Sequence, residues 1–292
     1  MEKRVILYGA GELTKKYLKE GTNDYEIVAI LDRRWSEMGT VCGHKVYSPE
    51  DVLKFEFEYV IIALDDLKPG MDCVIEEVFD FLKDQGVDPD KIILQSFKSL
   101  EHHVNRFPRK EYLVALSQLQ HKKHLQGDVA ECGVFRGWFA SMINECYPDK
   151  KLWLFDTFSG FDEKDVSADT EEAKRAIDEG KFDRFNVTSE EIVRLRCMHR
   201  DQLIFRKGYV PDTFEGVNEQ FCFVNLDMDL YVPQLAALKF FSKRMVKGGV
   251  ILVHDYYNKI FTGTTKAVDE YCKEHDVLMH PIGDGLSIAL LF

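Results

Sequence analysis

The stretch that decides the fold is the last one, Val277-Leu-Met-His-Pro-Ile-Gly-Asp-Gly-Leu-Ser-Ile-Ala-Leu-Leu-Phe292. Two apolar runs, Val277–His280 and Leu286–Phe292, flank the five residues Pro281–Gly285. A crossover between parallel strands needs a dozen or more residues, whereas a short turn is enough to join an antiparallel pair. The chain is therefore expected to end in an antiparallel hairpin.

Five further apolar runs precede this hairpin, and each has the length of a buried strand. They are Asp128–Cys132, Leu152–Phe155, Leu203–Phe205, Phe221–Leu226 and Val250–Val253. Continuous apolar runs separated by helical segments predict a parallel sheet covered on both faces. Five parallel strands and a terminal hairpin are typical of the seven-stranded sheet of class I methyltransferases, whereas a plain dinucleotide-binding domain lacks the final antiparallel strand. A helix over Glu111–Leu125 is expected to cover this sheet.

The first hundred residues predict a separate, smaller α/β domain with a Rossmann-like parallel sheet. Strands are expected over Val5–Tyr8, Glu26–Leu31, Tyr59–Leu64 and Lys91–Leu94, and helices over Glu12–Glu20 and Val74–Gln85. The pattern lapses into polar and basic residues between Ser96 and Arg109. Because domain boundaries fall in such polar segments, we place the accessory domain at residues 1–100 and the larger domain at residues 108–292.

A glycine turn closes the first strand of the smaller domain. Gly9-Ala10-Gly11 precedes a helix, and Asp32 ends the next strand, 21 residues beyond Gly11. In dinucleotide sites such a turn lets a pyrophosphate approach the helix N-terminus, and an acidic residue at that position binds the ribose. Thr14 stands where that pattern has a third glycine. The alternatives are a nucleotide site or a plain turn in an accessory domain.

A second glycine loop has the same context in the larger domain. Asp128–Gly137 follows a strand and opens a helix, Trp138–Cys146, and Asp156 ends the next strand. Gly133 allows a bend at the strand end, and Gly137 allows a ligand to approach the first helical turn. Asp156 can accept hydrogen bonds from a ribose diol. Together with the hairpin, this loop predicts a site for S-adenosylmethionine.

Carboxylates follow two neighbouring strands of the larger sheet. Asp227 and Asp229 end the fourth strand, and His254 and Asp255 end the fifth. Ligands of open α/β sheets bind at the carboxyl ends of strands, so these side chains are expected at one edge. Oxygen-rich groups suit a divalent cation such as Mg²⁺, which can acidify a bound hydroxyl. The alternative is that these residues only cap the helices that follow.

The crossover between the second and third strands of the larger sheet is unusually long. Between Asp162 and Arg200 it is rich in charged residues. A segment of this length is expected either to close over the active site as a lid or to form a solvated helical insertion. The isolated His199, His275 and His280 are interpreted as structural residues.

The composition excludes several classes of function. The 292 residues include 50 Asp and Glu against 38 Lys and Arg, a net charge of −12. Such an acidic chain lacks the electrostatic footprint of proteins that bind nucleic acid or anionic membranes. The seven cysteines form no CxxC pair, which argues against a zinc ribbon or a disulfide framework. No apolar run approaches about 18 residues, the length of a transmembrane helix, so we expect a cytoplasmic protein. Its partner is expected to be a small molecule. The sequence leaves open whether it forms a homo-oligomer.

Five blocks of the larger domain resemble the macrocin O-methyltransferase family. They are Glu131-Cys-Gly-Val-Phe-Arg-Gly137, Leu154-Phe-Asp-Thr-Phe-Ser-Gly-Phe161, Lys207-Gly-Tyr-Val-Pro-Asp-Thr-Phe214, Asp227-Met-Asp-Leu-Tyr231 and Gly248-Gly-Val-Ile-Leu-Val-His-Asp-Tyr256. These blocks occur in the family's order within residues 110–292. The resemblance implies methyl transfer from S-adenosylmethionine, usually with Mg²⁺, to a hydroxyl of a sugar or another natural-product acceptor.

The resemblance also implies roles for individual residues. Those expected at the cofactor are Glu131, Gly133, Arg136, Asp156, Thr157, Gly208 and Asp227. Asp227 is also expected to bind the metal, with Asp229 as the base for the acceptor hydroxyl. Where the family usually has two adjacent Asp ligands, this chain has His254 and Asp255. Because His binds Mn²⁺ better than Mg²⁺, three readings stay open: the metal differs, the site keeps fewer ligands, or the site is metal-free and His254 is the base.

The glycine turn of the smaller domain supports a rival function. Through Gly9–Gly11 the chain could be a nucleotide-sugar-binding protein or an NAD-dependent sugar-modifying enzyme. The smaller domain has no Tyr-x-x-x-Lys pair for hydride transfer, which disfavours the oxidoreductase. The most concrete prediction is therefore an S-adenosylmethionine-dependent O-methyltransferase.

Overall fold

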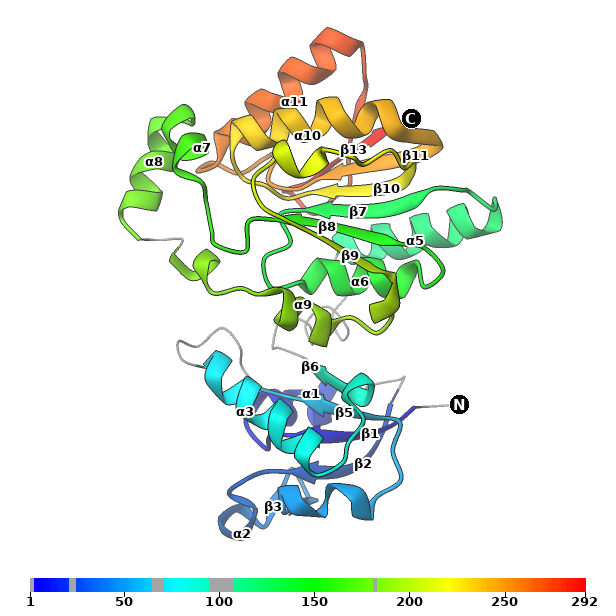
Figure 1. Ribbon diagram of the computed structural model, residues 1–292, viewed down its shortest axis with the longest axis vertical. Helices are drawn as coiled ribbons and strands as arrows, with labels where there is room; N and C mark the ends of the chain where they lie inside the picture. Colours follow the sequence, from blue (N-terminus) through cyan, green and yellow to red (C-terminus); the bar gives the residue numbers. More distant parts are fainter. Residues whose placement is uncertain (1–2, 21–24, 65–70, 95–107, 181–182) are drawn as a thin grey trace. The chain divides into compact units, whose positions relative to one another are not determined.

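The computed structural model describes residues 3–20, 25–64, 71–94, 108–180 and 183–292. The chain divides into two compact units, residues 1–106 and 107–292 (Figure 1). Each unit is built on a mainly parallel β-sheet with helices against it.

The smaller unit has six strands in the order β3-β4-β2-β1-β5-β6. The strands are β1 (Lys3–Tyr8), β2 (Tyr25–Leu31), β3 (Thr40–Val41), β4 (His44–Tyr47), β5 (Tyr59–Ile62) and β6 (Ile92–Leu94). The helices are α1 (Glu12–Glu20), α2 (Trp35–Met38) and α3 (Met71–Asp84). Strands β3 and β4 were not predicted from the sequence, because each contributes a single buried residue and so has no apolar run. The sheet is not wholly parallel, since β3 pairs antiparallel with β4.

The larger unit has seven strands in the order β12-β13-β11-β10-β7-β8-β9. The strands are β7 (Asp128–Cys132), β8 (Leu152–Asp156), β9 (Leu203–Lys207), β10 (Phe221–Leu226), β11 (Met245–Val253), β12 (Met279–Pro281) and β13 (Ile288–Leu291). The pairs among β7 to β11 are parallel, and β13 is antiparallel to both β11 and β12. The terminal hairpin and the seven-stranded class I methyltransferase sheet are thus confirmed.

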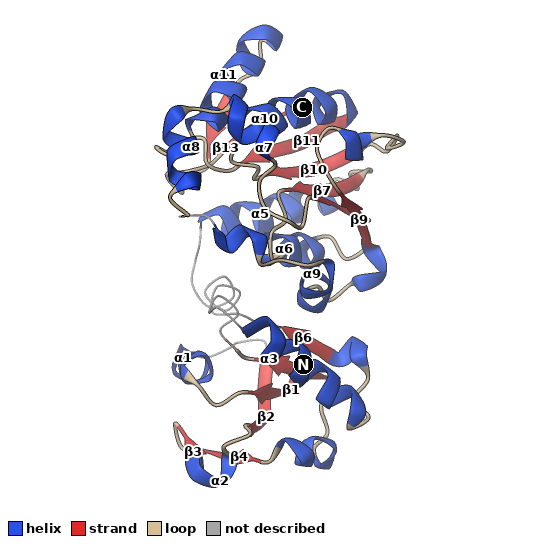
Figure 2. Cartoon of the chain, turned by 60° about the vertical axis from the view of Figure 1, so that its left-hand side comes forward, coloured by secondary structure: helices blue, strands red, loops and turns tan. Residues whose placement is uncertain are grey.

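Helices cover both faces of the larger sheet. They are α5 (Pro108–Lys122), α6 (Trp138–Cys146), α7 (Glu163–Ala168), α8 (Glu171–Asp178), α9 (Glu190–Arg196), α10 (Tyr231–Phe241) and α11 (Thr262–His275). Helices α10 and α11 lie on one face, and α5, α6 and α9 lie on the other (Figures 1 and 2). This coverage explains why β10 is buried along its whole length. Helix α5 begins at Pro108 rather than at the expected Glu111, since proline fits the first turn of a helix.

The long crossover contains α7, α8 and α9 and packs against the larger unit. Asp169, after α7, accepts a hydrogen bond from the Tyr231 amide (2.6 Å) at the start of α10. Asp165 of α7 accepts one from the Tyr209 hydroxyl (2.9 Å), after β9. These buried carboxylates attach the insertion to segments that follow the carboxyl ends of β9 and β10.

Asp165→Asn is expected to stabilise the protein at neutral pH. Burial raises the pKa of Asp165 to about 6, whereas the carboxyl of an unfolded chain ionises near pH 4. As the pH rises from 4 to 6 the unfolded chain loses this proton first, so the folded state loses stability and does not regain it above pH 6. The asparagine oxygen still accepts from Tyr209. We expect a gain of about 2 kcal/mol at pH 7.5, which vanishes near pH 4.

Thermal unfolding of the full chain at several pH values measures this gain. Glu163→Gln, which removes an exposed carboxylate of the same helix, is the matched control and should show no such pH dependence. A melting temperature of Asp165→Asn that equals the parent's at pH 7.5 contradicts the assignment.

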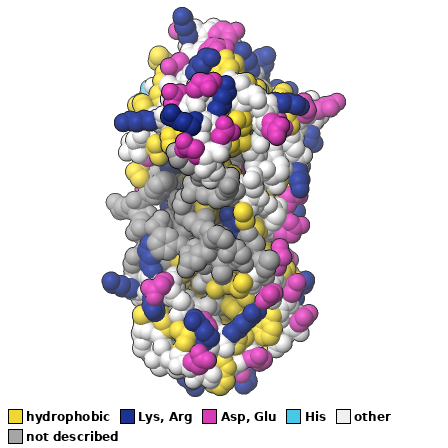
Figure 3. Space-filling model, turned by 90° about the vertical axis from the view of Figure 1, so that its left-hand side faces the viewer, with side chains coloured by type: hydrophobic (Ala, Val, Ile, Leu, Met, Phe, Trp, Pro, Cys, Tyr) yellow, Lys and Arg dark blue, Asp and Glu magenta, His cyan; other side chains and the backbone are white. Residues whose placement is uncertain are grey.

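The surface of the described residues carries both charge signs. In Figure 3 the basic and acidic side chains are interspersed, and those drawn form no large patch of one sign. No described helix combines the length and the apolar character needed to cross a bilayer. The coloured side chains of Figure 3 form no basic stripe of the kind that binds nucleic acid.

Candidate active site

The loop between β7 and α6 is held in place by the neighbouring strand ends. The Gly133 amide donates to the Phe155 carbonyl (2.9 Å), and a Cβ on Gly133 would collide with the Asp227 carbonyl oxygen. Gly137, the N-cap residue just before α6, has a φ of 75°, and a Cβ there would press on Val193 of α9. Both glycines are required for backbone conformation and close packing in this loop.

Asp156, at the end of β8, holds the same loop. Its Oδ2 accepts from the Val134 (2.7 Å) and Phe135 (2.8 Å) amides, and its Oδ1 accepts from the Phe158 amide (2.7 Å). Burial raises the pKa of Asp156 despite these hydrogen bonds. Asp156 therefore fixes the glycine loop, a role that its spacing in the sequence did not reveal.

Three other residues expected at the cofactor make contacts within the protein. Arg136 is 1% exposed, and its Nη1 donates to the Val187 carbonyl (2.7 Å) in the long crossover. The Thr157 hydroxyl donates to the Gly160 carbonyl (2.6 Å), and the Gly208 amide donates to the Asp156 carbonyl (2.9 Å). These contacts shape the loops at the carboxyl ends of β7, β8 and β9.

Glu131 on β7 lies beneath the loop and is 1% exposed. Its Oε1 accepts from Asn225 Nδ2 (2.8 Å), while its Oε2 is buried with no hydrogen-bond partner among the described residues. Burial raises the pKa of Glu131 well above its usual range. An orphaned polar atom under the loop fits a site that a polar ligand completes.

Three of the four residues expected at the carboxylate edge meet there. His254 Nδ1 lies 2.7 Å from Asp255 Oδ2 and 3.2 Å from Asp227 Oδ1. Since both partners are carboxylates, Nδ1 carries a proton in this arrangement. Burial and the nearby Arg109 lower the pKa of His254, but the carboxylates outweigh them and raise it to about 9. Burial raises the pKa of Asp227, yet His254 and Arg109 hold it below its usual range.

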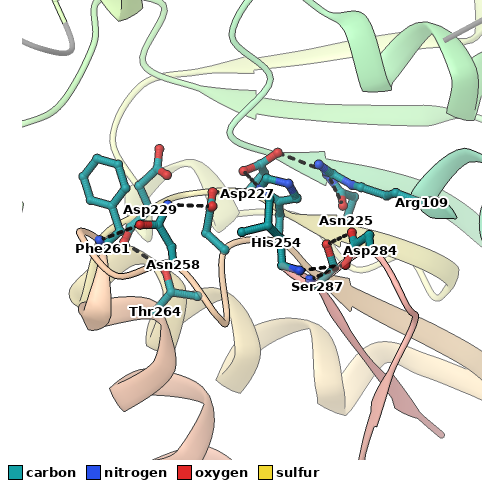
Figure 4. Close-up of polar contacts among 12 residues, drawn as sticks. Arg109, Asn225, Asp227, Asp229, His254, Asn258, Phe261, Thr264, Asp284 and Ser287 are labelled. Atoms are coloured by element: carbon teal, nitrogen blue, oxygen red, sulfur yellow. Dashed lines mark hydrogen bonds and ion pairs between the residues drawn. The ribbon is translucent and has the colours of Figure 1, made fainter. Parts of the chain in front are cut away.

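The fourth residue, Asp229, lies at the same edge, but its carboxylate is apart from the Asp227–His254 pair (Figure 4). Its backbone carbonyl accepts from the Thr264 hydroxyl (2.9 Å). Asp229 and Asp255 have φ values of 63° and 59°, a left-handed conformation that Asp and Asn adopt more readily than most residues. Such backbone strain after two adjacent strands is typical of functional sites.

Sequence reasoning missed two residues of this cluster, Arg109 and Asn225. Arg109 Nη2 donates to Asn225 Oδ1 (2.9 Å) and to Asp227 Oδ2 (3.0 Å). Asn225 was detectable as an amide inside the otherwise apolar run Phe221–Leu226. Arg109 precedes Asp227 by 118 residues and lies at the start of a helix, so no local pattern marks it.

The donor set of this cluster fits a divalent cation. Asp227, His254 and Asp255 each offer one ligand atom, and these atoms lie within 4.8 Å of one another. Two carboxylate oxygens and an imidazole nitrogen suit Mn²⁺ better than Mg²⁺, which prefers oxygen alone. Asp229 does not belong to this group of possible ligands.

The glycine turn of the smaller unit repeats part of this design. Asp32 Oδ2 accepts from the Ala10 amide (2.8 Å), and Oδ1 accepts from the Arg34 amide (2.8 Å). Gly9 has a φ of 109°, whereas a Cβ on Gly11 would meet nothing within 4 Å. Asp32 thus fixes the Gly9–Gly11 turn from within the unit.

Similar proteins share the fold and parts of the sequence. The chain is similar to the 8-demethyl-8-(2,3-dimethoxy-alpha-L-rhamnosyl)-tetracenomycin-C 4'-O-methyltransferase of Streptomyces olivaceus. The identity is 26% over an alignment of 187 residues, with coverage of 60% of this chain and 71% of the relative. The O-methyltransferase NovP has a similar structure, with a TM-score of 0.54, 21% identity and coverage of 76% of this chain and 97% of NovP. The calicheamicin methyltransferase CalS11 gives a TM-score of 0.51 at 17% identity, over 77% and 93% of the two chains. The two structures support the fold.

Models of whole families match both units. Residues 1–93 match the model described as C2185-like, N-terminal. Residues 109–284 match the model described as macrocin-O-methyltransferase (TylF). That segment spans more than half of the chain and contains the glycine loop, Asp156 and the carboxylate edge, so the chain belongs to the macrocin O-methyltransferase family.

Proposed function

We propose that this enzyme transfers the methyl group of S-adenosylmethionine to a hydroxyl of a sugar, either free or part of a natural product. The observation that carries the proposal is that the carboxylate edge, formed by Asp227, His254 and Asp255, lies beside the glycine loop between β7 and α6. The buried side chains Glu131, Asn225 and Arg109 and the partly exposed Asp227 link the two by consecutive hydrogen bonds. The relative from Streptomyces olivaceus, whose name specifies a rhamnosyl substrate, supports a sugar acceptor.

In this proposal the loop and the edge have different tasks. S-adenosylmethionine supplies an electrophilic methyl group when it is bound between Glu131, the Gly133–Gly137 loop and Asp156. Asp229 takes the proton of the acceptor hydroxyl. His254 is a poorer candidate for this base, because the neighbouring carboxylates raise its pKa to about 9, so that at neutral pH both ring nitrogens carry protons. Aligning the hydroxyl oxygen with the methyl carbon accounts for most of the remaining acceleration.

We further propose that Asp227, His254 and Asp255 hold a divalent cation. Such an ion polarises a hydroxyl and lowers its pKa. Binding requires His254 to give up the proton that Nδ1 now shares with the carboxylates. The Arg109 contact uses Asp227 Oδ2 and leaves Oδ1 facing His254, so the two cations do not compete for one oxygen.

A methyl-transfer assay tests the proposed function. The full chain is incubated with methyl-labelled S-adenosylmethionine and Mn²⁺ or Mg²⁺ in the presence of methyl α-L-rhamnopyranoside, 4-nitrophenyl α-L-rhamnopyranoside or a catechol. Transfer of label to a rhamnoside, with Asp229→Asn as the negative control, supports the proposal. Labelling of the catechol and of neither sugar contradicts the acceptor class.

Asp156→Ala is expected to weaken cofactor binding. The change removes the acceptor of three loop amides and the expected ribose contact, at a cost of about 1.5–3 kcal/mol, or roughly 10- to 150-fold in Kd. Calorimetry with S-adenosylhomocysteine measures the effect. Asp32→Ala removes the corresponding carboxylate of the smaller unit and should leave this affinity unchanged. Equal affinities of folded Asp156→Ala and the parent contradict the assignment.

We also propose that residues 108–292 bind the cofactor without residues 1–100. The seven-stranded sheet and the loop lie wholly within the larger unit. A truncated chain that begins at residue 101 keeps Arg109 and should bind S-adenosylhomocysteine as the full chain does. A folded truncation that fails to bind contradicts this division.

The rival nucleotide function has its own readout in the full chain. Thermal shifts with NAD and UDP-sugars report binding to the folded state. A shift that Gly11→Ala abolishes, without loss of S-adenosylhomocysteine binding, would assign a nucleotide site to the smaller unit. No shift with any of these nucleotides favours an accessory turn.

A further inference from the structure

Arg109 brings a buried positive charge to the carboxyl end of β10. It lies in the first turn of α5 and is 5% exposed. Its guanidinium carbon lies 4.0 Å from the centroid of the Phe139 ring of α6, a cation–π contact that fixes the plane of the group. The charge is therefore held in place from outside the strand that it contacts.

The contact between Arg109 and Asp227 determines which oxygen of the Asp227 carboxylate faces which neighbour. Oδ2 accepts from Arg109 Nη2 (3.0 Å), and Oδ1 faces His254 Nδ1 (3.2 Å). Rotation about the terminal bond of an Asp side chain is soft and roughly two-fold, so one neighbour alone would fix it poorly. Two neighbours on opposite oxygens, Arg109 Nη2 and His254 Nδ1, leave one orientation.

The same guanidinium nitrogen also fixes the orientation of the Asn225 side-chain amide. Nη2 donates to Asn225 Oδ1 (2.9 Å), which leaves Asn225 Nδ2 directed at Glu131 Oε1 (2.8 Å). Without Arg109 the amide could turn over and present its oxygen to the Glu131 carboxyl. Arg109 thus determines that Asn225 donates to Glu131, which lies beneath the glycine loop, rather than accepting from it.

We propose that Arg109 is a positioning residue for methyl transfer, which holds Asp227 so that its Oδ1 faces His254. The part of this inference that concerns turnover rests on the proposed function. The part that concerns geometry does not, because the NMR resonance of His254 Nδ1, which reports the contact with Asp227, can be measured without an acceptor.

The geometric part is tested by NMR of histidine side chains in the full chain with S-adenosylhomocysteine bound. The His254 Nδ1 resonance is assigned with His254→Gln. Arg109→Met and Asp227→Asn should each shift this resonance, and the double variant should shift it no further than Asp227→Asn alone. Such non-additivity is expected when one residue acts through the other.

Arg206→Met is the matched control for loss of an arginine. Arg206 bonds the Thr213 and Glu215 carbonyls next to β9 and contacts no carboxylate of the site among the described residues. It should leave the His254 resonance at its parental position. If Arg109→Met does not fold, Arg109→Gln, which keeps a donor but no charge, is measured in its place.

Kinetics test the consequence for turnover. Arg109→Met should lower kcat about 10- to 100-fold, as expected for a misplaced group, with KM for the acceptor within about threefold. The double variant with Asp227→Asn should be no slower than Asp227→Asn alone, and Arg109→Lys should recover part of the rate. A resonance that stays at its parental position in Arg109→Met, or additive losses of rate, overturns the inference. If no acceptor is methylated, the proposed function fails, whereas the resonance still decides the role of Arg109.

Discussion

Asp229→Asn should reduce turnover about 10²–10⁴-fold, the contribution typical of a general base, while cofactor affinity stays within a factor of two. Asn keeps the size of the side chain and tolerates the left-handed backbone of residue 229, so the loop after β10 should retain its shape. What is lost is the ability to accept the proton of the acceptor hydroxyl. Single-turnover rates with labelled S-adenosylmethionine, and calorimetry with S-adenosylhomocysteine, measure the two quantities.

A second substitution separates the base from its surroundings. Asp269→Asn removes an exposed carboxylate of α11 that accepts from the Tyr256 hydroxyl, and it should change turnover little. Near-normal rates in Asp229→Asn, together with a loss of more than a hundredfold in His254→Gln, would transfer the role of base to His254.

The strands of the larger sheet were predictable where they are apolar runs with a clear end. The bounds differ elsewhere: β11 begins at Met245 rather than Val250, and β12 is Met279–Pro281 rather than Val277–His280, because residues 245–248 and 279–281 are only partly buried or exposed. Phe221–Leu226 is buried throughout, and the hairpin followed from the short Pro281–Gly285 connection. The strands β3 and β4 of the smaller unit escaped prediction, since strands of two and four residues with one buried residue each leave no periodic signal.

Only those site residues that directly follow a strand could be predicted from the sequence. The topology rule brings Asp227, His254 and Asp255 together, because the carboxyl ends of neighbouring parallel strands share one edge. It does not say which oxygen faces which neighbour, and it cannot find Arg109, whose contact with Asp227 depends on how α5 packs on the sheet. Arg136 belongs to the glycine loop in sequence, and its guanidinium also contacts Val187 in the crossover, a contact that no sequence pattern marks.

Removal of divalent cations should lower turnover by about 10²–10⁴-fold, since a metal that polarises the acceptor contributes several kcal/mol. After dialysis against a chelator, added Mn²⁺ should restore the rate at lower concentration than Mg²⁺, because one of the three donors is the His254 imidazole. Electron paramagnetic resonance of Mn²⁺ gives an affinity that does not depend on finding an acceptor. Asp255→Asn should weaken that affinity, while Asp269→Asn should leave it unchanged.

The expected preference for Mn²⁺ over Mg²⁺ depends on the imidazole of His254, so one substitution at this position should reverse it. His254→Asp restores the pair of carboxylates usual in the family and removes the only nitrogen among the three donors, so it should shift the preference toward Mg²⁺, which binds oxygen ligands. It also removes the shared Nδ1 proton that an incoming ion has to displace. Preference for Mn²⁺ that persists in His254→Asp would remove His254 from the ligand set. Full turnover in excess chelator, with Asp227→Ala as active as the parent, would exclude a cation at this edge and leave His254 as the base to test.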